Sequence, residues 1–169
     1  DGSKCADVDI DNDSVLDYKD YCIYRLEGNY KVNDYGCPEP IWDEFSPELT
    51  TNISEVNLWN LTGFKIGVIG VGEIDFRDHQ IPLVKNISGA LLPVDLNELF
   101  EFLPYKVIVH SELYLPINVS STITLYNITN ITNPVIIRDN STCTDCQIIS
   151  FGNNSVTFSV PHHTEYSVS

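Results

Sequence analysis

Alternating apolar and polar residues dominate the chain from about residue 53 onward. Val107–Leu115 (VIVHSELYL) and Ser121–Ile128 (STITLYNI) show the two-residue period of half-buried strands, and Asn, Gly and Pro separate the blocks. The predicted strands lie within Phe64–Phe76, Val107–Leu115, Ser121–Ile128, Pro134–Arg138, Gln147–Ser150, Ser155–Val160 and Tyr166–Val168. Many short strands with such punctuation predict a mainly β protein, an antiparallel β-sandwich of the Ig-like or jelly-roll-like kind.

One stretch has a helical pattern instead. Apolar residues recur at helical spacing from Leu96 to Phe100, Asp95 is a suitable N-cap, and Pro104 stops the helix. We therefore expect one short helix over Asp95–Phe102.

Acidic rather than apolar residues set the pattern before residue 40. Carboxylates alternate from Asp9 to Asp13 and continue to Asp20, which closes a twelve-residue window. Calcium takes six to eight oxygens, and a twelve-residue loop supplies them from positions 1, 3, 5 and 12, a carbonyl at 7 and often a water-mediated ligand at 9. The predicted ligands are Asp9, Asp11, Asp13, Asp17, Asp20 and the carbonyl of Val15.

A solvated acidic run is the ordinary alternative for clustered charge. The regular register and the cysteine that follows favour the calcium loop, because unneutralised carboxylates packed this closely repel one another. The loop departs from an EF-hand at Ser14, which replaces Gly, and at Asp20, which replaces Glu. Glycine tolerates positive φ at little cost, so Ser14 predicts a strained turn or a lower affinity.

The pattern D-x-D-x-D-x-x-x-D-x-x-D-x-C, with a second cysteine at the end of a turn, resembles a thrombospondin type 3 repeat over about residues 5–38. The resemblance implies a calcium-binding module at residues 1–40 and a disulfide between Cys22 and Cys37. Pro38 and Pro40 then mark the boundary to a β-sandwich domain at residues 41–169.

A second set of motifs lies in residues 72–169: GEIDF, INVSSTITLYNI, NPVIIRD, CTDC and VTFSVPHHTEYSV. Together they resemble a β-rich domain near the C-terminus of archaeal secreted and surface proteins. The resemblance implies a sandwich and a surface context. It implies no catalytic activity.

Charge excludes some partners. The chain has 169 residues and a net charge of −15, and residues 1–55 alone hold 14 acidic and 4 basic residues. Such a chain repels nucleic acid and anionic membrane surfaces, so neither is an expected partner. No apolar run reaches the length of a membrane span, and the chain lacks an initiator Met and a signal peptide, as a processed or excised chain would.

Asparagine sequons are unusually frequent and indicate a secreted, glycosylated surface. Asn12 also matches but lies inside the acidic loop, where we do not expect a glycan. The predicted glycosylation sites are Asn52, Asn60, Asn86, Asn118, Asn127, Asn130, Asn140 and Asn153.

Five cysteines fit an oxidising compartment. Cys143 and Cys146 are close enough in C-T-D-C to bridge one turn. Cys5 is left over, and it either pairs with another chain or takes Cys22 from Cys37. Zinc bound by Cys143, Cys146 and the two histidines after Pro161 is a weaker alternative, because adjacent residues of a strand point to opposite faces.

No catalytic constellation is recognisable, so we do not expect an enzyme. There is no nucleophile elbow, and the glycines at 67, 70 and 72 precede no helix, so they indicate bulges or close backbone approach. Glu73, Asp75 and Asp78 are the residual candidates for carboxylate chemistry.

These observations predict a secreted, glycosylated, calcium-binding structural protein of the cell surface. We expect it to self-assemble as a filament or surface-layer subunit, so its main partner is a second copy of itself. The alternative is an adhesion or carbohydrate-binding module of a larger surface protein, with glycans or neighbouring surface proteins as partners. Exposed tyrosines would mark this alternative; the candidates are Tyr18, Tyr21, Tyr24, Tyr30 and Tyr35.

Overall fold

The computed structural model describes residues 8–23 and 30–169, which fall into two compact units. The units interleave along the chain, whereas the sequence prediction divided the chain once near residue 40. The first unit contains the described residues up to Ile41 together with Asn52–Leu61 and Gln80–Asp95. The second contains Trp42–Thr51, Thr62–His79 and Leu96–Ser169.

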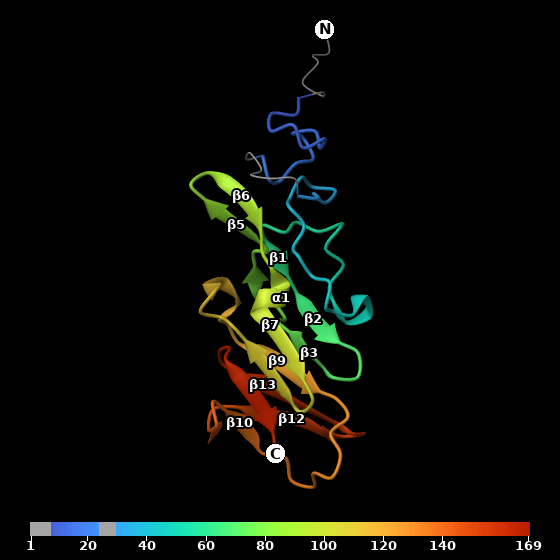
Figure 1. Ribbon diagram of the computed structural model, residues 1–169, viewed down its shortest axis with the longest axis vertical. Coiled ribbons are helices and arrows are strands. Elements are labelled where there is room, and N and C mark those ends of the chain that lie inside the picture. Colours follow the sequence, from blue (N-terminus) through green and yellow to red (C-terminus); the bar gives the residue numbers. More distant parts are fainter. Residues whose placement is uncertain (1–7, 24–29) are drawn as a thin grey trace. The chain divides into compact units, whose positions relative to one another are not determined.

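The second unit is built on two antiparallel five-stranded sheets (Figure 1). One sheet has the order β12–β13–β9–β3–β2, with bounds Gln147–Gly152, Ser155–Val160, Ser121–Leu125, Gly72–Asp75 and Lys65–Val68. The other has the order β11–β10–β14–β8–β7, with bounds Ser141–Thr142, Ile136–Arg138, Glu165–Val168, Lys106–Val109 and Phe100–Leu103. The prediction of a mainly β, antiparallel fold is confirmed.

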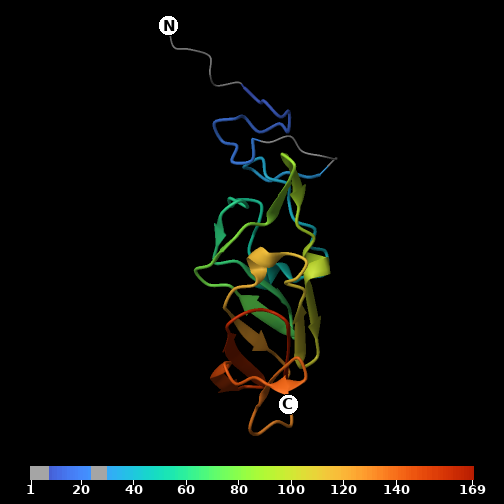
Figure 2. The same ribbon diagram turned by 90° about the vertical axis from the view of Figure 1, so that its left-hand side faces the viewer.

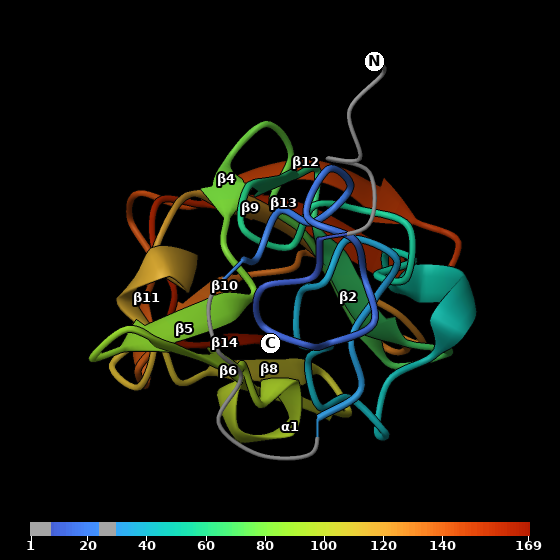
Figure 3. The same cartoon turned by 90° about the horizontal axis from the view of Figure 1, so that it is seen from above.

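Aromatic rings from both sheets fill the space between them. Phe76, which follows β3, stacks on Phe64 with ring centroids 5.5 Å apart and meets Phe100 of β7 at 6.1 Å. Phe158 of β13 meets Tyr166 of β14 at 6.2 Å, and all five rings are buried. Figure 3 shows β9 and β13 on one side and β8 and β14 on the other, and Figure 2 shows the second unit turned by 90° from Figure 1. The second unit is therefore a sandwich with a continuous apolar core.

The one short helix that the sequence predicts is present, but it ends earlier than the predicted span Asp95–Phe102. The helix α1 covers only Leu96–Leu99, and Phe100–Leu103 form β7, which pairs with β8 across a turn at Tyr105 (φ 64°). The apolar residues in 100–103 fit the spacing of a helix and also the alternation of a strand. The strand forms because pairing with β8 buries Phe100 and completes a ladder of backbone hydrogen bonds. Two 3₁₀ turns complete the unit, η1 at Pro47–Leu49 and η2 at Leu115–Ile117.

The glycine-rich segment is a hairpin of β2 and β3. A Cβ at Gly67 would lie 2.7 Å from the carbonyl oxygen of Gly72, and one at Gly72 would lie 2.8 Å from that of Thr124. Gly70 turns the chain with φ 75°. Gly67 and Gly72 therefore serve close backbone approach, as the sequence predicted.

The first unit has less regular structure. Its strands are the hairpin of β5 (Val84–Ile87) and β6 (Ala90–Pro93) and the strand β4 (Gln80–Ile81). β4 pairs with β1 (Leu61–Thr62), and the division between the units falls within β1. The acidic loop and the turn before Pro38 make up most of its described remainder. None of the helices in the described part of the chain has the length and hydrophobicity needed to span a bilayer.

Candidate metal centre

The acidic loop is wound around its own carboxylates. The two oxygens of Asp9 accept hydrogen bonds from the backbone N–H groups of Asp13 and Ser14, at 3.2 and 3.1 Å. Asp13 Oδ1 accepts from the N–H of Val15 at 2.7 Å. To follow this path, Asn12 and Ser14 adopt positive φ of 62° and 79°. The strain predicted from serine at loop position 6 is present.

Three carboxylates converge within this loop. Oxygens of Asp9, Asp11 and Asp13 all lie within 4.8 Å of one another. Calcium binds oxygens at 2.3–2.6 Å, so oxygens on opposite sides of one ion are about 5 Å apart. The spacing therefore fits a single calcium ion.

Several of the oxygens are buried and have no hydrogen-bond partner among the described residues. They are both oxygens of Asp11, Oδ2 of Asp13 and Oδ2 of Asp20. A buried acceptor without a partner costs free energy, more so when it is charged. A bound cation would remove that cost.

The electrostatics indicate the same deficit of positive charge. Burial, followed by the charges of Asp13 and Asp20, raises the pKa of Asp11 to about 6. Burial also raises the pKa of Asp13 and of Asp20, although a backbone N–H opposes the shift in each. Without a cation, burial and the neighbouring negative charges make the ionised form of these carboxyl groups less favourable than it is in water.

The turn before Pro38 closes the centre from the other side. Gly36 has φ 74°, and a Cβ there would lie 2.2 Å from Asp20 Oδ1 and 2.8 Å from Asp13 Oδ2. Only glycine lets this backbone approach the two carboxylates so closely. Asp20 is thus brought to the same side of the loop as Asp13.

Asn33 holds this turn in place, and sequence reasoning missed it. Its buried side-chain amide donates to the carbonyls of Ile53 and Val56, at 3.0 and 2.8 Å. Its Oδ1 accepts from the N–H groups of Tyr35 and Cys37, at 3.1 and 3.2 Å. Asn with Gly three residues later is a turn signal, but the partners at 53 and 56 are distant in sequence.

The Cys22–Cys37 disulfide joins the end of the loop to the turn, as expected, and both cysteines are buried. The N–H of Tyr21 donates to the carbonyl of Tyr35 at 2.9 Å beside it. This covalent link substitutes for the apolar core that the segment lacks. Cys5 and Tyr24 lie outside the described residues.

Asp17 and Val15 have different places from the four other predicted ligands. Asp17 Oδ1 accepts from the N–H of Ile10 at 2.9 Å, and the N–H of Asp17 donates to the carbonyl of Val8 at 2.9 Å. Asp17 therefore ties the second half of the loop to its beginning, and it is not among the three carboxylates that converge within 4.8 Å. Val15, whose carbonyl is the predicted ligand, directly follows Ser14, the residue with a positive φ of 79°.

A hollow of about 850 Å³ opens beside the loop. Tyr18, Tyr21 and Tyr35 line it together with polar side chains that include Asp13 and Lys19. Tyr18 and Tyr21 are exposed, and the rings of Tyr21 and Tyr35 lie 5.2 Å apart. Tyr30 is also exposed but does not line this hollow.

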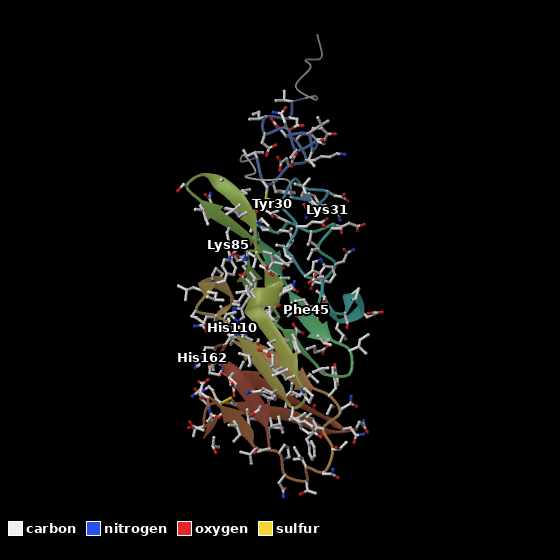
Figure 4. All side chains as sticks on the ribbon, in the orientation of Figure 1. Tyr30, Lys31, Phe45, Lys85, His110 and His162 are labelled. Atoms are coloured by element: carbon white, nitrogen blue, oxygen red, sulfur yellow. A yellow bond between two sulfur atoms is a disulfide. The ribbon has the colours of Figure 1, made fainter. Side chains whose placement is uncertain are left out.

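In the second unit, Cys143 and Cys146 form a disulfide, so neither thiolate is available to zinc. Arg138 Nη1 lies 2.7 Å from Asp145 Oδ1 and 3.3 Å from the Nε2 of His162, which is labelled in Figure 4. His163 is buried elsewhere against Phe76, with ring centroids 5.1 Å apart. The zinc alternative is therefore wrong for this oxidised structure.

The remaining candidate residues are dispersed. All eight predicted glycosylation asparagines are exposed. Asp75 forms an ion pair with Lys65 at 2.9 Å and lies beside Glu73 on one strand, while Asp78 is in the following turn.

Comparison with known proteins leaves the chain without a family. No family model matches it, and no curated protein matches it. The C-terminal domain of nuclear pore complex component NUP116 from Candida glabrata is similar in structure, with a TM-score of 0.45 and 15% sequence identity. The match covers 72% of this chain and 91% of that one.

Proposed function

We propose that this protein is a secreted, glycosylated, calcium-binding structural protein that assembles with copies of itself at the cell surface. The observation that carries the proposal is the convergence of Asp9, Asp11 and Asp13 with unpartnered buried oxygens. Asp20 and the carbonyl of Val15 complete the expected ligand set, and Asp17 contributes through water. Calcium would neutralise a loop that otherwise raises the pKa of its own carboxyls.

Three features support the extracellular part of the proposal. Two disulfides fit an oxidising compartment. The sequons at Asn52, Asn60, Asn86 and five further positions are exposed, as glycan acceptors need to be. The proposed calcium site also suits the calcium-rich exterior of cells, where calcium-binding modules have dissociation constants of about 10⁻⁴–10⁻³ M.

A carbohydrate-binding module is the second candidate, and the tyrosine-lined hollow is the observation that favours it. Exposed rings of Tyr18 and Tyr21 offer flat apolar faces, and Asp13 and Lys19 offer polar groups for hydroxyls. Monomeric native material that binds glycans would favour this candidate over assembly.

Chelation tests the assembly function. Excess chelator added to native material should reduce particle size while the far-UV circular dichroism of the sandwich persists, because the core of the second unit contains no predicted metal ligand. Assemblies that keep their size after the calcium is demonstrably removed would contradict calcium-dependent assembly. The test should be repeated under reducing conditions, because an interchain disulfide through Cys5 would mask the effect.

A further inference from the structure

The two sheets of the sandwich have four edge strands, and one of them lacks the usual protection. On β2, Lys65 is paired with Asp75; β7 carries Glu101 and ends before Pro104; β11 has only two residues. The fourth edge, β12, has six residues, QIISFG, without charge or proline. Proteins normally guard such edges because they are templates for further strands.

The side chains of β12 are apolar and uncovered. Ile148, Ile149 and Phe151 are 41%, 51% and 42% exposed. Ile148 lies opposite Phe158 and Phe151 lies opposite Val156, which are buried core residues of β13. Ile148 and Phe151 therefore extend the inward-facing side of the sheet beyond the part that the sandwich covers.

A bulge in β12 sets the spacing of these side chains. The register shifts between Ile148 and Ser150, so three positions separate Ile148 from Phe151 although both share one face. A regular strand repeats each face every two residues. A second β12, which carries the same bulge, has the matching spacing.

We propose that β12 pairs antiparallel with β12 of a second copy of this chain, about a two-fold axis between Ile149 and Ser150. Ile148 of each copy then lies opposite Phe151 of the other, and the two sheets continue into one. The inference rests on the proposed self-assembly and names one contact within it. Isologous pairing of this kind uses one patch twice and closes on itself.

Charge favours a second copy over another partner. The chain carries −15, so close approach of two copies is unfavourable wherever their acidic surfaces meet. Residues 113–137 and 147–164, which contain β9, β12 and β13, have no Asp, Glu, Lys or Arg. The neutral edge is where two acidic copies can meet without repulsion, and it offers no charge to a charged partner.

Two substitutions and their mixture test the pairing. Ile148→Lys and Phe151→Glu should each weaken association at least about tenfold, because each buries two unpaired charges in the two-fold contact. An equimolar mixture of the two variants should restore association to within about threefold of wild type. In the mixed pair, the lysine introduced into one copy faces the glutamate introduced into the other, and the second contact keeps the native Phe151 and Ile148.

Sedimentation equilibrium in calcium is the measurement, with circular dichroism to verify folding. Ile69→Lys is the matched control, because Ile69 is 59% exposed in the β2–β3 turn at the opposite edge of the same sheet, and it should associate like wild type. Wild-type assembly with unaffected variants, or variants that the mixture does not rescue, would overturn the β12 contact alone. A wild-type chain that stays monomeric in calcium would overturn the proposed assembly function as well.

Discussion

At the scale of single residues, His163 is the most unusual ionisable group of the sandwich. Its side chain is buried and neither ring nitrogen has a hydrogen-bond partner among the described residues. Burial, with a smaller effect of His162, lowers the pKa of His163 to about 3. The folded protein therefore keeps this ring neutral where the unfolded chain, with an ordinary pKa of 6.5, takes up a proton.

The free energy of unfolding should consequently fall as the pH drops below 6.5. Between pH 8 and pH 5 the contribution of His163 is about 2 kcal/mol, and His163→Leu should abolish it. Denaturant unfolding at several pH values, in saturating calcium, measures the slope. His79→Gln is the control, because His79 is exposed and removing it leaves His163 in place. A His163→Leu variant with the wild-type slope would contradict the account.

Ser14 is the strained residue of the metal centre. A left-handed conformation costs an L-residue roughly 1–2 kcal/mol, and glycine adopts it freely but loses more entropy on ordering. Ser14→Gly should therefore tighten calcium binding by up to about fivefold, since loop ordering and ion binding are coupled. Asn12→Gly, at φ 62°, should gain less because asparagine tolerates this region. Equal gains at both positions, measured by calcium titration, would show that strain at Ser14 is not the cause.

At the scale of elements, the fit between the acidic loop and the turn of Gly36 is the feature to test. A Cβ at Gly36 meets carboxylate oxygens of Asp20 and Asp13, and these side chains can yield only by leaving the positions of metal ligands. Gly36→Ala should therefore weaken calcium binding at least about tenfold.

Gly89→Ala is the matched control for that substitution. Gly89 has a similar φ, 88° against 74°, in the β5–β6 hairpin, but a Cβ there has nothing within 4 Å. It should cost the hairpin about 1 kcal/mol and leave calcium affinity unchanged. Loss of affinity in both variants would assign the effect to backbone strain and contradict the steric argument.

Some of these elements were predictable from the sequence pattern, and others were not. Strict alternation located β9, β13 and β14, since each has one buried face. Sequence patterns did not predict the strand at Phe100–Leu103, because the helical spacing of apolar residues that begins at Leu96 continues to Phe100. They also missed the β5–β6 hairpin, in which Asn86 and Ile87 are exposed and no clear period is present. The register of the acidic loop was readable because calcium requires fixed positions, whereas the approach of Gly36 and the anchoring by Asn33 depend on contacts distant in sequence.

At the scale of the whole molecule, charge and assembly are linked. Residues 1–55 hold 14 of the 24 acidic residues, while β9, β12 and β13 hold none. Bound calcium would cancel part of the negative charge and so lower the overall repulsion between two copies. The acidic segment would then regulate contacts that the neutral sheet edge provides.

The proposed function depends on calcium binding by the acidic loop, which isothermal titration calorimetry tests most directly. The wild-type chain should bind calcium, and Asp11→Asn should bind it at least about tenfold more weakly, because both oxygens of Asp11 are buried without another partner. Asp78→Asn, the same charge change in the exposed turn after β3, should bind like wild type. Wild-type affinity should also fall as the pH drops through about 6, where the proton on Asp11 competes with the ion. No calcium binding by wild type, or unchanged affinity in Asp11→Asn, would contradict the account.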